Sequence, residues 1–345
     1  MAPGSRQLKK VCLERATYMS GSPIDDATLM TFAGIAYGAV ENIPRYVQES
    51  PQISTDWAVV WTPAEDENPD NLAYIALDQS SGMAVLAIRG TYPNPFSPIY
   101  WENGQQDSPF GPMQAWPGGG NAKISNGTNT GFSNLIALVG ANGLTIEETV
   151  AKLPQDVVLC VTGHSLGGTL APVLALKLSK NDPSRSINIT SFAGLTPGNK
   201  AFAELFASDT PLSGKVRRIY NTLDSVSYGW NNVLATRNFF FPNPQGGFLV
   251  KIFLLLAWLR LKLGGYNYAA IGQSEQLTGQ VQDPSKTGPI AYVLETLHQH
   301  MPDTYLSILG APPLPFSILF GNVTVDKGHA KERTPKRSTV PVFHT

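Results

Sequence analysis

The chain has 345 residues and a formal net charge of −1, with 42% hydrophobic and 15% charged residues. This apolar content is enough for a large core, which excludes the disordered, collagen-like and coiled-coil classes. A nearly neutral chain lacks the clustered Lys and Arg that nucleic-acid binding requires, so we expect no nucleic-acid partner. Cys12 and Cys160, the only cysteines, are too few for a disulfide framework or a zinc site. The oligomeric state does not follow from these properties.

The N-terminal run Met1–Lys10 contains basic residues without an apolar segment after them. It lacks the hydrophobic region of a signal peptide, so we expect a cytoplasmic location by default, with secretion by another route left open. The most apolar stretch, Phe248–Leu263, includes Lys251, Arg260 and Lys262. It is also shorter than the roughly 20 residues of a membrane-spanning helix, so we expect no transmembrane segment.

No internal repeat or low-complexity linker divides the chain, which favours one domain. We expect an N-terminal extension over residues 1–24, a single domain over 25–325 and a basic, disordered tail over 326–345. Residues 92–129 are rich in Pro, Gly, Asn and aromatic residues without a clean period, which predicts a long lid loop. An apolar insertion occupies about 239–268.

The first regular elements are a helix and a hairpin. The pattern predicts a helix around Leu29–Tyr37, with Asp25 or Asp26 as its N-cap. Two apolar runs, Leu72–Leu77 and Met83–Ile88, are separated by turn residues and predict antiparallel strands.

After a helix that begins near Thr145, short apolar runs alternate with helical runs. The predicted strands are Val157–Val161, Ile187–Phe192 and Lys215–Tyr220, and the predicted helices are Gly167–Lys180, Lys200–Ala207 and Tyr292–Leu297. This alternation predicts an α/β fold with a mostly parallel central sheet and helices on both faces.

The segment Gly163–Gly168 has the pattern G-x-S-x-G between the predicted strand ending at Val161 and the following helix. In that setting a sharp turn holds the serine at the top of the sheet as a nucleophile. The glycines allow strand and helix backbones to approach closely. Ser165 is therefore the candidate nucleophile, although a capping serine in a glycine-rich turn has the same local pattern.

A serine nucleophile needs a histidine base and a carboxylate that orients it. Asp224 follows the predicted strand Lys215–Tyr220 and is the candidate acid, although an aspartate there can also be a simple turn residue. The histidines downstream of Ser165 are His298, His300, His329 and His344. The last two fall in or beside the tail, which leaves His298 and His300.

Five segments in the correct order resemble the class 3 lipase family, the fungal-lipase-like branch of the α/β-hydrolases. They are Ala87–Thr91, Thr130–Phe132, Gly163–Gly168, Asn221 to Val226, and His300 to Leu306. The similarity spans about residues 25–310 and implies an α/β-hydrolase fold with lid or cap insertions. The loop Phe192–Asn199 departs from the family pattern, and the interval from Asp224 to His300 is enlarged.

The resemblance also implies catalytic roles. Ser165 would attack the ester carbonyl, His300 would act as general base and then general acid, and Asp224 would fix the histidine tautomer. The family-like spacing to Tyr305 favours His300 over His298.

The backbone N–H groups of Thr91 and Leu166 would form the oxyanion hole, with the Thr91 hydroxyl as a third donor. The implied reaction is hydrolysis of carboxylic esters of lipids, as in a triacylglycerol lipase or esterase, at an oil–water or membrane interface. It requires neither an organic cofactor nor a metal. Two alternatives are a phospholipase or thioesterase with the same triad, and a non-catalytic binding module, which would lack a triad member.

The apolar insertion has two interpretations. As a helix, Phe248–Leu263 is apolar nearly all round, and such helices are usually buried, which favours a helix covered by the cap. Alternatively, this helix and the loop 92–129 border the acyl pocket, and opening exposes an apolar patch that binds lipid surfaces.

Overall fold

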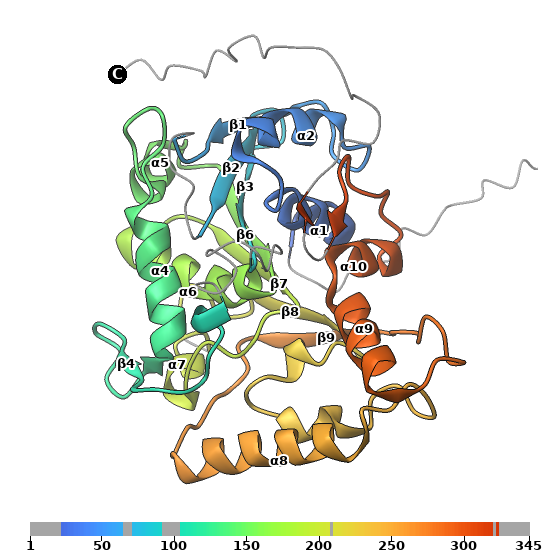
Figure 1. Cartoon of the computed structure of the whole chain (residues 1–345). Coiled ribbons are helices and arrows are strands. Elements are labelled where there is room, and N and C mark those ends of the chain that lie inside the picture. The colour runs from blue at the N-terminus through green and yellow to red at the C-terminus, as the bar shows by residue number, and fades with distance from the viewer. Residues whose placement is uncertain (1–21, 65–70, 92–103, 208–209, 320–321, 324–345) are drawn as a thin grey trace, which may run out of the picture.

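The computed structural model describes residues 22–64, 71–91, 104–207, 210–319 and 322–323. The predicted tail 326–345 and nearly all of the predicted extension 1–24 lie outside these ranges. A seven-stranded sheet in the order β1-β2-β3-β6-β7-β8-β9 forms the centre (Figure 1). Its strands are β1 (Trp57–Trp61), β2 (Ala73–Asp78), β3 (Met83–Ile88), β6 (Val158–His164), β7 (Ile187–Phe192), β8 (Val216–Asn221) and β9 (Gln273–Leu277).

The strands β1, β2 and β3 pair antiparallel, whereas β3, β6, β7, β8 and β9 pair parallel. The predicted hairpin and the predicted parallel core are therefore both present. The α-helices are α1 (Asp26–Ile35), α2 (Ile43–Glu49), α4 (Asn126–Ala137), α5 (Ile146–Lys152), α6 (Leu166–Asn181), α7 (Lys200–Glu204), α8 (Gly247–Leu263), α9 (Gly288–His300) and α10 (Pro302–Ile308). The 3-10 helices are η1 (Val40–Asn42), η2 (Val226–Tyr228) and η3 (Val233–Asn238).

Helices cover both faces of the sheet (Figure 1). The helices α4, α5 and α6 lie on one face, where Leu170 and Leu174 pack among the apolar side chains of the parallel strands. The helices α1 and α10 lie on the other face, where Phe32 and Tyr305 are fully buried. Because both faces are covered, the central strands β2 and β7 are buried along their whole length.

Side chains cap two helices where the sequence suggested. Asp25 is the N-cap of α1, and its carboxylate accepts a hydrogen bond from the Thr28 backbone N at 2.9 Å. At α5 the Thr145 and Glu148 side chains form a reciprocal capping box. Each cap satisfies backbone N–H groups that the first helical turn leaves without partners.

The edge strand β9 has no apolar pattern, and the sequence analysis did not predict it. Its Glu275 pairs with Arg217 of β8 at 2.6 Å, and Arg217 also pairs with Asp26 at the start of α1 at 2.5 Å. An edge strand faces solvent and can be polar. Backbone pairing with β8 and this ion-pair network therefore hold β9 in the sheet.

The part of the predicted lid loop that the structure describes contains regular structure. A short hairpin joins β4 (Gln114–Ala115) and β5 (Lys123–Ile124), and α4 already begins at Asn126. Residues 104–106 form a helical turn. Residues 92–103 of the predicted loop lie outside the described ranges.

The preference for a buried insertion helix is wrong. The helix α8 lies at the periphery, away from the central sheet (Figure 1), and Phe248 and Leu263 on it are 76% and 86% exposed. Neighbouring elements cover only its inner side, because Leu261 packs with Val233 and Tyr268 in a small cluster separate from the main core. Among the described residues, no helix is long and apolar enough to cross a membrane.

Candidate active site

Ser165 occupies the turn between β6 and α6, with a backbone φ of 59° and ψ of −124°. A positive φ is strained for a residue with a side chain, so the surrounding structure must enforce it. A Cβ on Gly167 would lie 2.1 Å from the Ile88 carbonyl oxygen, and one on Gly163 would lie 2.4 Å from the Gly167 carbonyl carbon. The two glycines of the motif therefore permit the close approach that presents Ser165.

His300, the last residue of α9, lies between Ser165 and Asp224. Its Nε2 is 2.8 Å from Ser165 Oγ, and its Nδ1 is 2.9 Å from Asp224 Oδ2 and 3.0 Å from Oδ1. Burial acts to lower the pKa of His300, but the charge and hydrogen bond of Asp224 outweigh it, so the pKa is raised. The structure thus brings together the nucleophile, base and acid that the resemblance implied.

Asp224 is fully buried just after β8, and several donors hold its carboxylate. The Tyr305 hydroxyl donates to Oδ2 at 2.7 Å, Ser227 Oγ donates to Oδ2 at 3.0 Å, and the Val226 backbone N donates to Oδ1 at 3.0 Å. The Tyr305 hydroxyl in turn accepts from the Asn221 backbone N at 3.0 Å. Donors of this kind compensate the cost of burying a charged group. The sequence analysis used Tyr305 only for its spacing and missed this contact.

The other two histidines near the site have different surroundings. His298 lines a separate cavity of about 720 Å³ that does not include Ser165. His164 lies beneath the serine turn, with its Nδ1 2.9 Å from the Tyr37 hydroxyl. Burial lowers the pKa of His164 well below its usual range, so this imidazole is neutral.

Both predicted oxyanion-hole residues lie beside the nucleophile. Leu166 is the first residue of α6, where backbone N–H groups have no partner within the helix. Thr91 lines the same cavity as Ser165. Its hydroxyl donates to Asp107 Oδ2 at 2.8 Å, so the single hydroxyl hydrogen is directed at this carboxylate.

Asp107 is a site residue that the sequence analysis missed, because it lies in the segment without a clear pattern. Burial raises the pKa of Asp107 to about 6, although the Thr91 hydrogen bond and the nearby His300 act in the opposite direction. Its Oδ1 is buried without a hydrogen-bond partner among the described residues. The carboxyl group therefore titrates near pH 6, and its Oδ2 accepts the hydrogen bond from the Thr91 hydroxyl.

A cavity of about 790 Å³ opens at Ser165 and His300. Its walls are mainly apolar and include Phe253, Leu254 and Ala257 from α8 together with Trp230 and Val233. A cavity of this size and character suits a hydrocarbon chain attached to a reactive polar group. Among the described residues, no group of three or more His, Cys, Asp or Glu side chains could hold a metal ion.

The chain is also similar to known proteins. A family model described as Lipase (class 3) matches residues 85–228. A protein named secreted alkaline triacylglycerol lipase, from Penicillium cyclopium, is 31% identical over 90 residues, which cover 26% of this chain and 30% of that protein. The crystal structure of a protein named M37 lipase has a TM-score of 0.68 and 26% identity, covering 83% of this chain and 94% of the other.

These findings are consistent with the class 3 lipase family, as the five sequence segments indicated. The architecture is that of the α/β-hydrolase lipases, which confirms the predicted fold. The matches also support a carboxylic ester hydrolase.

Proposed function

We propose that this chain is a serine hydrolase that cleaves carboxylic esters of lipids through an acyl-serine intermediate. The observation that carries the proposal is the hydrogen-bonded relay from Ser165 through His300 to Asp224, with distances of 2.8 Å and 2.9 Å. This relay opens into a cavity with mainly apolar walls.

In the proposed reaction, Ser165 Oγ attacks the ester carbonyl carbon while His300 Nε2 takes the hydroxyl proton. Asp224 stabilises the resulting imidazolium and keeps Nδ1 protonated. The backbone N–H groups of Leu166 and Thr91 stabilise the oxyanion of the tetrahedral intermediate. His300 then protonates the leaving alkoxide, and an alcohol departs. Water then attacks the carbonyl carbon of the acyl-serine while His300 takes a proton from it. His300 returns this proton to Ser165 Oγ as a carboxylic acid departs.

We further propose a lipid ester of the acylglycerol type as the substrate. The apolar cavity walls support an acyl chain, and the curated relative is named a triacylglycerol lipase. The alignment spans only 30% of that relative, so the substrate proposal depends on the cavity as much as on the name of the relative. A phospholipase or a thioesterase could use the same triad, whereas a non-catalytic module is disfavoured because His300 contacts both Ser165 and Asp224.

The default of a cytoplasmic location is not supported, because the curated relative is named as secreted. A secreted location is compatible with the proposed substrate. Immunodetection of the native protein in culture medium and in cell extract distinguishes the two locations.

The nucleophile assignment is tested with Ser165→Ala and a matched control, Ser108→Ala, a serine that lines the same cavity. We expect Ser165→Ala to lower hydrolysis of p-nitrophenyl esters by several orders of magnitude, because triad residues act as a unit. Ser108→Ala should retain most activity, and a fluorophosphonate probe should label only enzymes that contain Ser165. Near-native turnover by Ser165→Ala would refute the proposal.

The substrate class is tested with emulsified triglycerides, phospholipids and acyl thioesters assayed side by side. For a lipase, tributyrin hydrolysis rises when the concentration exceeds the solubility limit. A smooth hyperbola through that limit would indicate a plain esterase.

A further inference from the structure

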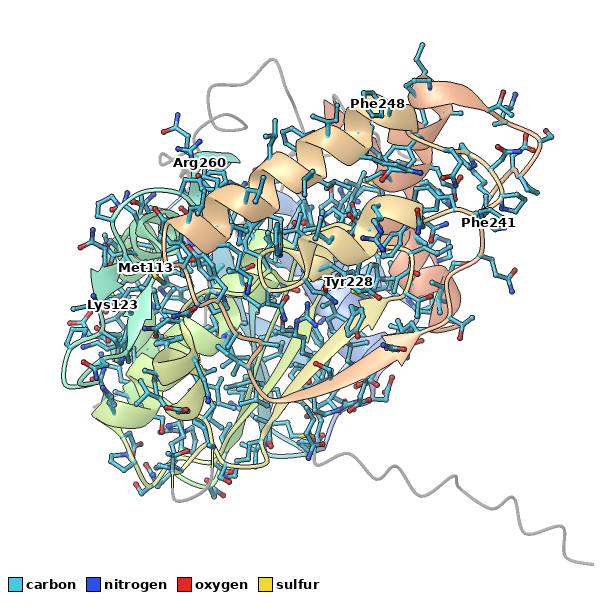
Figure 2. The ribbon with its side chains drawn as sticks, turned by 90° about the horizontal axis from the view of Figure 1, so that it is seen from below. Met113, Lys123, Tyr228, Phe241, Phe248 and Arg260 are labelled. Carbon is cyan, nitrogen blue, oxygen red and sulfur yellow. The ribbon has the colours of Figure 1, made fainter. Side chains whose placement is uncertain are left out.

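The exposed side of α8 is a continuous apolar stripe. Phe248, Ile252, Leu256, Leu259 and Leu263 are all exposed, and their spacing of three or four residues places them along one side of the helix. Figure 2 shows α8 at the periphery, with Phe248 near one end and Arg260 near the other. We call these five side chains the outer stripe.

Further exposed apolar side chains lie on α9. Ile290, Val293 and Leu294 of α9 are exposed as well, and the N-terminal end of α8 adjoins α9 where Gly246 approaches Tyr292. Among the described residues, Val139 is the one exposed large hydrophobic side chain outside α8, α9 and the neighbouring Phe241. Such a concentration of apolar surface marks an interaction site rather than the scatter found on ordinary surfaces.

The charged residues on α8 and in the chain on either side of it are all basic. Residues 225–274 contain no Asp or Glu but include Arg237, Lys251, Arg260 and Lys262, although the whole chain has a net charge of −1. On α8 the positions of Lys251 and Lys262 flank one side of the stripe and that of Arg260 flanks the other. Long basic side chains at the border of an apolar helix face can reach headgroups while the apolar residues enter the acyl region.

The inner side of α8 borders the candidate active site. Phe253, Leu254 and Ala257 line the cavity that contains Ser165, whereas Phe248, Leu256 and Leu263 do not. A surface that contacts the outer stripe therefore lies against the helix whose inner side lines this cavity.

We propose that the outer stripe of α8, with the adjoining face of α9, docks on a lipid surface that carries anionic headgroups. The inference deepens the proposed function and rests on it, since the docked surface supplies the ester. A second copy of the chain fits less well, because a two-fold contact would bring the basic residues of one stripe towards those of the other.

The test measures flotation of the protein with phosphatidylcholine vesicles and with vesicles that also contain about 30% phosphatidylglycerol. The Ser165→Ala protein is used, so that hydrolysis does not alter the vesicles. The triple variant Phe248→Ser, Leu256→Ser and Leu263→Ser should lower the vesicle partition coefficient at least about tenfold. Each substitution removes the favourable free energy of transferring an apolar side chain from water into the lipid. The matched control Val139→Ser, which removes an exposed side chain elsewhere, should bind as well as the parent.

The charge contribution is tested with Lys251→Gln and Lys262→Gln together, compared with the exposed control pair Lys123→Gln and Lys152→Gln. The variant with both α8 lysines replaced should lose at least about half of the preference for anionic vesicles, because each lysine near a membrane surface contributes to binding anionic lipid. The control pair should retain the preference. An unchanged preference in the α8 pair would overturn the anionic assignment.

Two further outcomes would overturn the docking proposal. The first is vesicle binding by the triple variant that equals that of the parent. The second is a parent protein that is a dimer by light scattering and a triple variant that is a monomer, with no difference in vesicle binding between them. Hydrolysis of a soluble p-nitrophenyl ester by the triple variant with Ser165 intact should stay at the wild-type level. Failure of docking thus leaves the esterase assignment standing, and absent esterase activity in the wild type rejects the proposed function instead.

Discussion

The Tyr305 hydroxyl links the candidate acid to the backbone of β8, and Tyr305→Phe removes this link without a change in ring packing. Tyr305 is fully buried, and its hydroxyl makes two close hydrogen bonds, one to the Asp224 carboxylate at 2.7 Å and one from the Asn221 backbone N at 3.0 Å, with Ser227 Oγ farther away at 3.5 Å. A hydrogen bond to a charged group contributes about 1.5–3 kcal/mol, and a neutral one about 1 kcal/mol. We therefore expect the free energy of unfolding to fall by about 2–4 kcal/mol.

The matched control is Tyr74→Phe. Tyr74 is also fully buried, but its hydroxyl makes a neutral hydrogen bond to the Phe32 carbonyl oxygen at 2.8 Å and contacts no triad residue. Its loss should cost about 1 kcal/mol and leave kcat unchanged. Urea unfolding at pH 7, analysed with a common slope, gives both differences in stability.

Activity provides the second measurement. Asp224 keeps its contacts with Val226 and Ser227 in Tyr305→Phe, so the carboxylate stays near His300 but is less firmly held. We expect kcat to fall by about tenfold, equivalent to about 1.4 kcal/mol, compared with about four orders of magnitude for Asp224→Asn. A variant with wild-type kcat and no greater loss of stability than Tyr74→Phe would refute the positioning role of Tyr305.

Three other predictions concern the histidines and Asp107. His300→Ala should abolish esterase activity and His298→Ala should retain most of it, as measured with p-nitrophenyl acetate; the reverse result would transfer the base to His298. The base must be neutral and the pKa of His300 is raised, so kcat/KM should fall as pH drops through a midpoint above 6.5, and a flat profile to pH 5 would contradict this. Protonation of Asp107, whose folded pKa is about 6, favours folding, so the contribution of this group to wild-type stability should fall as pH rises from about 4 to 6. Asp107→Asn lacks this titration, and its stability relative to wild type should increase by roughly 2 kcal/mol over that range in urea titrations; a difference independent of pH would contradict the raised pKa.

Local sequence was sufficient for the features that depend on neighbours along the chain. The two glycines around Ser165, the apolar strand before it and the helical run after it together indicated the serine turn, because each contributes within a few residues. The hairpin of β2 and β3 and the alternation of strands and helices followed from the same local patterns. His300 required the family resemblance as well, because its spacing alone did not separate it from His298.

The tertiary structure decided what depends on residues far apart in sequence. Asp107 and Thr91 meet across the part of the chain that has no periodic pattern, and Tyr305 reaches Asp224 from α10. The strand β9 is polar and forms by pairing with β8. No local sequence pattern predicts that pairing.

The helix α8 shows most clearly what the sequence alone could not predict. Its apolar composition predicted a helix, and the helix is present, but composition could not say which of its sides would find a partner within the fold. Burial is a property of the surroundings that the rest of the chain provides. Here those surroundings bury Leu261, partly bury Leu254 and Ala257, and leave the outer stripe exposed.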